Sequence, residues 1–347
     1  MTKSFPKQNQ ITILGIESSC DETSAAVVVN GQEVISCVVA SQNELHGKFK
    51  GVVPEIASRA HLEKINVVVE EALRQAKVGF DDVDAVAAVN TPGLIGSLLI
   101  GFTAAKTFAW ALGKPLIAIH HVQAHAYGAV LNYSGAAFPS VAFLVSGGHT
   151  SLYKCSDPLN MELIGSTQDD AAGEAFDKVA SILDLPFPGG PMIDKLGREG
   201  NPSAIRFPRT WLKKESLNFS FSGLKTSVLY HVRGTDLSRP DSSHLTHQKK
   251  ADIAASFQAA VVEVLVEKAM LACKKFNLRK LLVGGGVAAN SYFRSELARR
   301  TNEENIELIL AKRNLCTDNA AMVGGLAYHK FIANQFADWN ENVISTT

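Results

Sequence analysis

Residues 11–29, ITILGIESSCDETSAAVVV, are the first of two similar segments in this chain. The apolar run 11–16 predicts a strand, the polar residues after it a turn, and 24–29 a returning strand before the hairpin signal Asn30-Gly31. Residues 141–155, VAFLVSGGHTSLYKC, repeat the order of strand, small-residue turn and strand. This internal duplication predicts two similar lobes that face each other across a central cleft.

Strands alternate with helices between and after these segments, which indicates an α/β fold. Residues 83–89 predict a buried strand, followed by a glycine-containing turn and an apolar helix that ends near Leu112. Residues 279–283 predict another strand, and Gly284-Gly285-Gly286 leads from it into a helix at Ala289-Asn290. A glycine triplet in this position is a moderately specific nucleotide-binding signal, and ordinary packing is the alternative interpretation.

The length of 347 residues suits two domains better than one. We expect an N-terminal lobe at residues 11–120, completed by a helix at about 320–334, and a C-terminal lobe at residues 121–319.

His121 and His125 are the strongest chemical signal, because a four-residue spacing places two imidazoles on one helix face. They follow the predicted strand 115–119, and in open α/β proteins ligands bind where the chain leaves the sheet. The spacing alone fits a metal site and a pair of ordinary core or surface histidines equally well. A zinc peptidase needs a glutamate directly after the first histidine, and Val122 occupies that position, so a metallopeptidase is disfavoured.

Asp318 precedes the predicted C-terminal helix and has two interpretations. It is well placed to cap that helix. As a loop carboxylate it is equally suited to complete a site of two histidines and one carboxylate, which leaves coordination positions open for a substrate. The sequence does not choose between these roles.

Composition limits the classes of function. The 34 basic and 34 acidic residues balance, so the chain lacks the charge of a stand-alone nucleic-acid binder, and any RNA contact must be local or shared with partners. The basic, aromatic segment 206–214 is the best local candidate, although a solvated loop is the more ordinary interpretation. Five scattered cysteines without a Cys-x-x-Cys indicate reduced thiols. Residues 1–10 are polar and no apolar run reaches membrane length, so we expect a cytoplasmic protein without a membrane span.

Several motifs together closely resemble the TsaD family, the universal enzymes that make tRNA threonylcarbamoyladenosine, and the resemblance runs from about Ile11 to Ala333. The motifs, in chain order, are Gly15–Thr23, Gly51–Arg59, the His121/His125 pair, Val145–Thr150, Asp169–Lys178, Phe219–Lys225 and Cys316–Asn319. The resemblance implies an actin-like ATPase (ASKHA) fold with two duplicated lobes.

The resemblance also implies a reaction: transfer of a threonylcarbamoyl group from threonylcarbamoyl-AMP to N6 of the adenosine at position 37 in tRNAs that read codons beginning with A. His121, His125 and Asp318 match the family's metal ligands, for one divalent ion, most simply Fe²⁺ with Zn²⁺ or Mg²⁺ as alternatives. No residue is assigned as a catalytic acid or base, and Glu22 is only a candidate base. The positions that match substrate-binding residues are Leu144, Val145, Ser146, Gly147, Gly148, Asp177, Gly190, Asp194 and Asn290.

The partners implied are tRNA, a TsaB-like protein, a TsaE-like ATPase and a separate synthase that supplies threonylcarbamoyl-AMP, with no membrane. One departure from the family is Thr91, which stands where the family has glycine and makes the turn there less permissive. Two other functions remain as alternatives: an ATPase or phosphotransferase of the actin-like fold, and a non-catalytic tRNA-binding scaffold.

Overall fold

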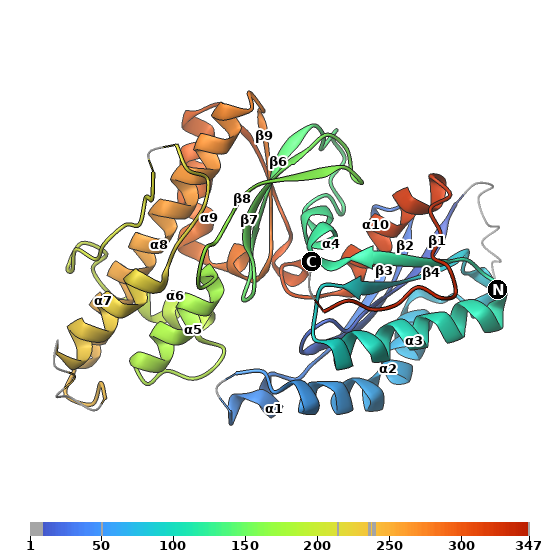
Figure 1. Ribbon diagram of the computed structural model, residues 1–347, viewed down its shortest axis with the longest axis horizontal. Coiled ribbons are helices and arrows are strands. Elements are labelled where there is room, and N and C mark those ends of the chain that lie inside the picture. The colour runs from blue at the N-terminus through green and yellow to red at the C-terminus, as the bar shows by residue number, and fades with distance from the viewer. Residues whose placement is uncertain (1–9, 50, 214, 235–236, 238–240, 346–347) are drawn as a thin grey trace. The chain divides into compact units, whose positions relative to one another are not determined.

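The computed structural model describes residues 10–49, 51–213, 215–234, 237 and 241–345 (Figure 1). The polar residues 1–9 and Lys214, on which two of the expectations above depend, lie outside this description. The chain forms two compact units. Unit 1 takes in the described residues of 1–45, 52–135 and 318–347, and unit 2 those of 46–51 and 136–317.

This division differs from the expected boundary at residue 120. Apart from the short segment 46–51, the chain passes into unit 2 after Gly135, because helix α4 (His121–Gly128) packs against helix α10 (Ala320–Ile332) and stays with unit 1. The histidine pair therefore belongs to the same unit as Asp318.

Unit 1 is built on a five-stranded mixed sheet with the strand order β3-β2-β1-β4-β5. The first three strands are antiparallel neighbours, and β4 and β5 run parallel to β1. Side chains of Leu14 and Ile16 share one apolar core with α2 and α3, whereas α10 packs on the other face of β1, at Gly15. The elements are β1 (Thr12–Glu17), β2 (Glu22–Val29), β3 (Glu33–Ser41), α1 (Asn43–Gly47), α2 (Pro54–Ala76), η1 (Phe80–Asp82), β4 (Ala85–Thr91), α3 (Ile95–Leu112) and β5 (Leu116–His120).

Unit 2 repeats this sheet with the order β10-β9-β6-β7-β8. Strands β6, β7 and β8 are antiparallel neighbours, and β9 and β10 run parallel to β6, so β6 takes the place that β1 has in unit 1. Its elements are β6 (Ser140–Val145), β7 (Thr150–Cys155), β8 (Met161–Ser166), α5 (Ala172–Ile182), α6 (Gly189–Gly197), α7 (Ser222–Arg233), α8 (His247–Lys275), β9 (Lys280–Gly284), η2 (Gly286–Ala289), α9 (Ser291–Glu303), β10 (Glu307–Leu310) and η3 (Arg313–Leu315). The predicted duplication is confirmed.

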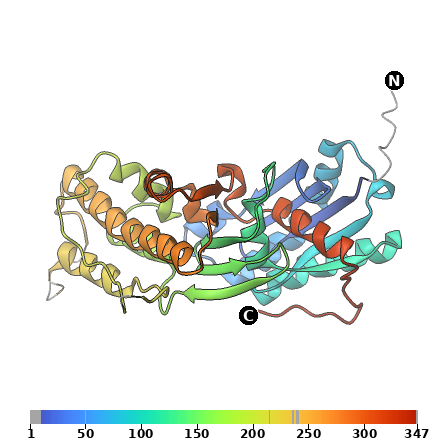
Figure 2. The ribbon, with the colours of Figure 1, turned by 90° about the horizontal axis from the view of Figure 1, so that it is seen from above.

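Helix α8 is the central helix of unit 2 and is the long orange helix in Figure 2. It packs against α6 and α9 and buries most of its apolar residues. The predicted turn Asn30-Gly31 also forms, with φ of 50° and 72° at the two residues, the left-handed conformation that a tight hairpin requires.

Helix α3 is an exception to the expectation that no segment has the length and apolar character of a membrane span. Among the described residues it alone is long and apolar enough to cross a membrane, with a mean hydropathy of 1.4, because the charge of Lys106 interrupts the apolar run without lowering the average much. The core helix of a globular unit passes the same test. In this structure α3 packs on β4 and α2 and buries Leu98, Phe102 and Ala105.

Candidate metal centre and ligand-binding loops

His121 and His125 lie on one face of α4, which begins where β5 ends. Both side chains are buried, and their rings meet edge to face with centroids 4.6 Å apart. Nε2 of His125 lies 2.9 Å from Oδ1 of Asp318, and Nε2 of His121 lies 3.7 Å from the same oxygen. The one-face arrangement predicted from the four-residue spacing is thus present, and the third group comes from a residue almost 200 positions later.

Asp318 reaches this position because α10 is held tightly against β1 and α4. A Cβ atom at Gly15 would lie 2.4 Å from the carbonyl oxygen of Ala320, so the backbones of β1 and α10 touch. On α4, the Tyr127 hydroxyl makes a 2.8 Å hydrogen bond with Nε2 of His329. These contacts hold both ends of α10 in place, and Asp318 lies two residues before its start.

The cap of α10 is Asn319, not Asp318. The Asn319 side chain accepts a 3.1 Å hydrogen bond from the backbone N–H of Met322. This answers the question that the sequence left open, because the carboxylate of Asp318 is not used as the cap and faces the two histidines instead.

A buried carboxylate supports His121 from the side away from Asp318. Oε2 of Glu17, at the end of β1, lies 3.1 Å from Nδ1 of His121, and Oγ of Ser19 lies 3.0 Å from the same nitrogen. Burial by itself lowers the pKa of His121, but the carboxylates of Glu17 and Asp318 outweigh it and raise the pKa to about 9. Glu17 was not among the residues predicted for the site, although a lone acid at the end of an apolar strand is a usable signal.

A second acidic group adjoins the first, since carboxylate oxygens of Asp21, Glu22 and Asp318 lie within 4.8 Å of one another. Burial, together with the charges of Asp318 and Asp21, raises the pKa of Glu22 to about 10. A raised pKa of this kind favours the protonated form of the Glu22 carboxyl. Burial also raises the pKa of the Cys20 thiol, which disfavours the nucleophilic thiolate form.

The donor set of His121, His125 and Asp318 fits one divalent ion. One ligand atom from each residue falls within 4.8 Å of the other two, and two of the three groups are buried. Two imidazole nitrogens and a carboxylate oxygen suit iron or zinc better than magnesium, which prefers oxygen ligands.

In unit 2, the loop Ser146–Gly148 joins β6 to β7 in a tight turn. Ser146 donates its N–H to the His149 carbonyl at 2.8 Å, and its hydroxyl accepts the His149 N–H at 3.1 Å. The start of α5 packs on this loop, since a Cβ atom at Gly173 would lie 2.6 Å from the main-chain carbonyl oxygen of Ser146. A Cβ at Gly147 or Gly148 would meet nothing within 4 Å, so open space adjoins both. Leu144 and Val145 are buried residues at the end of β6, directly before this loop.

Asp177 and Gly190 lie at the junction of α5 and α6. Oδ1 of Asp177 accepts a 2.7 Å hydrogen bond from the N–H of Gly189, which fixes the first residue of α6. A Cβ at Gly189 would clash with Ala180, whereas one at Gly190 would meet nothing within 4 Å. Gly189 is therefore required for packing, and Gly190 faces open space.

Asp194 and Asn290 join α6 to the start of α9. Oδ1 of Asp194 accepts a 2.7 Å hydrogen bond from the Ser291 hydroxyl. Asn290 caps α9 by accepting from the Phe293 N–H at 2.9 Å and donates to Gln258 at 2.7 Å. All the predicted substrate-binding residues thus lie in unit 2, and all the predicted metal ligands lie in unit 1.

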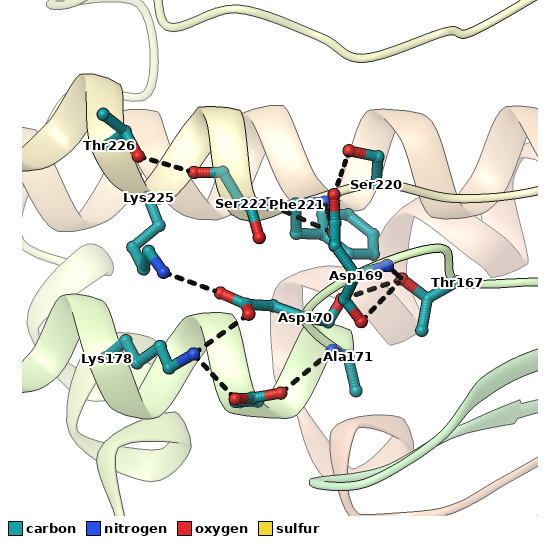
Figure 3. Close-up of polar contacts among 11 residues, drawn as sticks. Thr167, Asp169, Asp170, Ala171, Lys178, Ser220, Phe221, Ser222, Lys225 and Thr226 are labelled. Carbon is teal, nitrogen blue, oxygen red and sulfur yellow. Dashed lines mark hydrogen bonds and ion pairs between the residues drawn. The ribbon is translucent and has the colours of Figure 1, made fainter.

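Asp169 and Asp170, just before α5, contact neighbouring segments through hydrogen bonds and ion pairs (Figure 3). Asp169 accepts hydrogen bonds from the Ser220 hydroxyl and from the Phe221 N–H, at 2.5 and 2.7 Å. Asp170 pairs with Lys178 on α5 at 2.9 Å and with Lys225 on α7 at 3.1 Å. The carboxylate of Asp170 therefore links two helices.

The structure also bears on the basic segment 206–214 and on Thr91. In the basic segment, Arg209 pairs with Glu263 on α8 at 2.9 Å, so part of its charge is neutralised within unit 2. Thr91 ends β4 without a positive φ, so the replacement of the family glycine strains no backbone there.

Comparisons with known proteins agree on the family. The family model for TsaD, tRNA N6-adenosine threonylcarbamoyltransferase, matches residues 33–325. Proteins of that name from Moorella thermoacetica and Clostridium kluyveri are 52% and 47% identical to this chain, over 340 and 335 residues, and each alignment covers 96% of both chains.

Among solved structures, full-length HypF in its phosphate- and nucleotide-bound form is similar, with a TM-score of 0.61 and 15% identity over 94% of this chain and 47% of HypF. Component A of the (R)-2-hydroxyglutaryl-CoA dehydratase of Acidaminococcus fermentans has a TM-score of 0.52 and 16% identity, over 92% and 98%. These likenesses confirm the actin-like ATPase fold. The chain belongs to the TsaD family of tRNA N6-adenosine threonylcarbamoyltransferases.

Proposed function

We propose that this chain transfers a threonylcarbamoyl group from threonylcarbamoyl-AMP to N6 of adenosine 37 in tRNAs that read codons beginning with A. The observation that carries the proposal is the 52% identity, over 96% of both chains, to a curated tRNA N6-adenosine threonylcarbamoyltransferase. The convergence of His121, His125 and Asp318 supports it, because a site of two histidines and one carboxylate leaves coordination positions open for a substrate.

The chemistry of the donor explains why no nucleophilic side chain is needed. Threonylcarbamoyl-AMP is a mixed anhydride with an activated carbonyl carbon. The adenosine N6 forms a bond to that carbon, the bond from carbon to the phosphate oxygen breaks, AMP leaves, and N6 loses a proton. Holding the two reactants together and stabilising the oxyanion supply the rate enhancement. Cys20, with its raised pKa, stays a thiol and takes no part.

Unit 1 holds the metal ion in this proposal. His121, His125 and Asp318 would bind one divalent cation, Fe²⁺ in preference to Zn²⁺, with Mg²⁺ least suited to two imidazoles. When bound, the ion would act as a Lewis acid on the threonylcarbamoyl oxygens.

Unit 2 holds the donor. The main-chain N–H groups of Ser146, Gly147 and Gly148 would bind the adenylate phosphate, as free amides beside a helix start do. Leu144 and Val145 would contribute main-chain groups, and Asp177, Gly190, Asp194 and Asn290 would contact the threonyl, ribose and base groups. Open space beside Gly147, Gly148 and Gly190 supports this assignment, because a ligand can approach those backbones closely.

The partners belong to the same proposal. The chain has no net charge, so tRNA binding would be shared with TsaB-like and TsaE-like proteins in the cytoplasm, while a separate synthase supplies the donor.

Mass spectrometry of tRNA nucleosides tests the reaction. Unmodified tRNA is incubated with threonine, bicarbonate, ATP, the synthase, the partner proteins and either wild type, His121→Ala, Asp318→Ala or His247→Ala. His247 is a matched control, since it is an exposed histidine of unit 2 that pairs with Glu199. We expect the modified nucleoside from wild type and His247→Ala, and none from the two ligand variants, which also lose bound metal. ATP hydrolysis without any modified nucleoside would favour the actin-like ATPase instead.

A second experiment tests the donor loop alone. Gly147→Ala adds a methyl group where nothing lies within 4 Å, so the variant should keep the wild-type melting temperature. The methyl group would occupy the space assigned to the phosphate, so affinity for a non-hydrolysable analogue of threonylcarbamoyl-AMP should fall at least tenfold. Unchanged affinity would contradict the assignment of this loop to the donor.

A further inference from the structure

Glu17 is a fully buried acid whose two oxygens have separate partners. Its relative exposure is 0%, although it is the last residue of β1. Oε1 accepts a 2.6 Å hydrogen bond from the backbone N–H of Ser19, and Oε2 lies 3.1 Å from Nδ1 of His121. An ionised carboxylate can only accept hydrogen bonds, so both partners must be donors.

This contact favours a proton on Nδ1 of His121. Where Oε2 of Glu17 accepts from Nδ1–H, the lone pair of the neutral, metal-binding ring lies on Nε2. Nε2 is the atom on the side of Asp318, 3.7 Å from Oδ1. The buried carboxylate therefore selects the ring form whose free nitrogen points toward the other two candidate ligands.

We propose that Glu17 is a positioning residue of the metal centre, which holds His121 in the Nδ1-protonated form and orients Nε2 toward the ion. The inference rests on the metal site of the proposed function and deepens it. A carboxylate on the far nitrogen of a histidine ligand orients the ring and makes it more basic. Glu17 also adds a second negative charge to that of Asp318, which favours a divalent cation.

Glu17→Gln is a sharp test because an amide cannot replace both acceptors. Glutamine has one oxygen and one NH₂ group, so it cannot accept from both Ser19 N–H and His121 Nδ1–H, and only the Ser19 hydroxyl, 3.0 Å from Nδ1, would remain as a further acceptor for the ring among the contacts described. If the oxygen accepts from Ser19, the NH₂ group faces Nδ1 and drives the proton to Nε2, where it blocks metal binding. If the oxygen accepts from His121, the NH₂ group opposes the Ser19 N–H and the end of β1 shifts.

Thr23→Val is the matched control. Thr23 is also buried in the β1–β2 hairpin, and its hydroxyl makes a 2.8 Å hydrogen bond with Nδ1 of His61, which is not among the candidate ligands. The control removes a buried contact between a hydrogen-bonding side chain and a histidine without touching His121. General loosening of the hairpin would affect both variants, and loss of the proposed role would affect only Glu17→Gln.

Affinity for Co²⁺ or Zn²⁺ is measured on metal-free full-length protein in competition with a chromophoric chelator. We expect binding by Glu17→Gln to be weaker by roughly 10–100-fold, with Thr23→Val close to wild type and His121→Ala as the reference for a lost ligand. Wild-type affinity in a folded Glu17→Gln protein would overturn the inference while leaving the metal centre intact. Equal affinity in wild type and His121→Ala would overturn the metal centre and the role of Glu17 with it.

The ring form is measured directly by ¹⁵N NMR of histidine-labelled protein, which needs no variant and so does not depend on whether Glu17→Gln folds. In wild type with Zn²⁺, the His121 signals should show a protonated Nδ1 and a metal-bound Nε2. A His121 ring bound through Nδ1 would refute the proposal.

Discussion

Gly15→Ala should push α10 away from β1 and displace Asp318. The added Cβ would lie 2.4 Å from the Ala320 oxygen and 2.8 Å from the Gly324 nitrogen. Both are main-chain atoms, so no side-chain rotation relieves the clash. Ordinary contact begins at 3.4 Å, which means that the start of α10 must retreat by about 1 Å (3.4 minus 2.4).

The energetic cost follows from that displacement. Overpacking a well-packed site costs about 1–3 kcal/mol, and the lower entropy of the unfolded alanine chain returns about 0.4–1 kcal/mol. A net loss of about 1–2 kcal/mol corresponds to a fall in the melting temperature of unit 1 of roughly 2–8 °C. Binding sites tolerate ligand shifts of only about 0.5 Å, so metal affinity should fall as well.

Calorimetry and metal titration of Gly15→Ala measure both effects. Gly79→Ala is the control in the same unit, because its Cβ would lie at an ordinary 3.6 Å from Asp82 and its φ of −94° suits alanine. The control should match wild type or be slightly more stable. If Gly15→Ala kept the wild-type melting temperature and metal affinity, the close crossing of β1 and α10 would not be what positions Asp318.

Three further predictions concern stability. Asp169→Ala removes the acceptor at the start of α7 and should cost about 1 kcal/mol in urea unfolding, and a wild-type midpoint would contradict that role. Lys106→Met removes the hydrogen bonds to the Trp339 and Glu341 carbonyls, so limited proteolysis within residues 338–345 should become faster, whereas an unchanged rate would show that other contacts hold this segment. Burial and the neighbouring His121 lower the pKa of His120 from 6.5 to about 4 in the folded protein. Between these two pH values His120 is therefore protonated in the unfolded chain and neutral in the folded protein. Stability should therefore fall as the pH drops from 6.5 to 4, and His120→Gln should flatten this slope unless other groups cause it.

Local patterns in the sequence were enough to predict the duplicated lobes and the histidine pair. The apolar runs 11–16 and 141–145 became the corresponding strands β1 and β6, because period and length determine a strand locally. The spacing of His121 and His125 determines that they share a helix face, whatever the helix packs against. The TsaD resemblance, carried by motifs along the whole chain, predicted the family.

The role of Asp318 and the support from Glu17 depended on tertiary contacts. Whether a carboxylate before a helix caps it or faces a histidine depends on what packs there, and here Asn319 takes the cap while the crossing at Gly15 brings Asp318 to α4. Glu17 and His121 are 104 residues apart, and no local pattern relates them. Element type follows from short-range periodicity, but the convergence of side chains at a site follows from packing between elements far apart in sequence, which only the folded chain specifies.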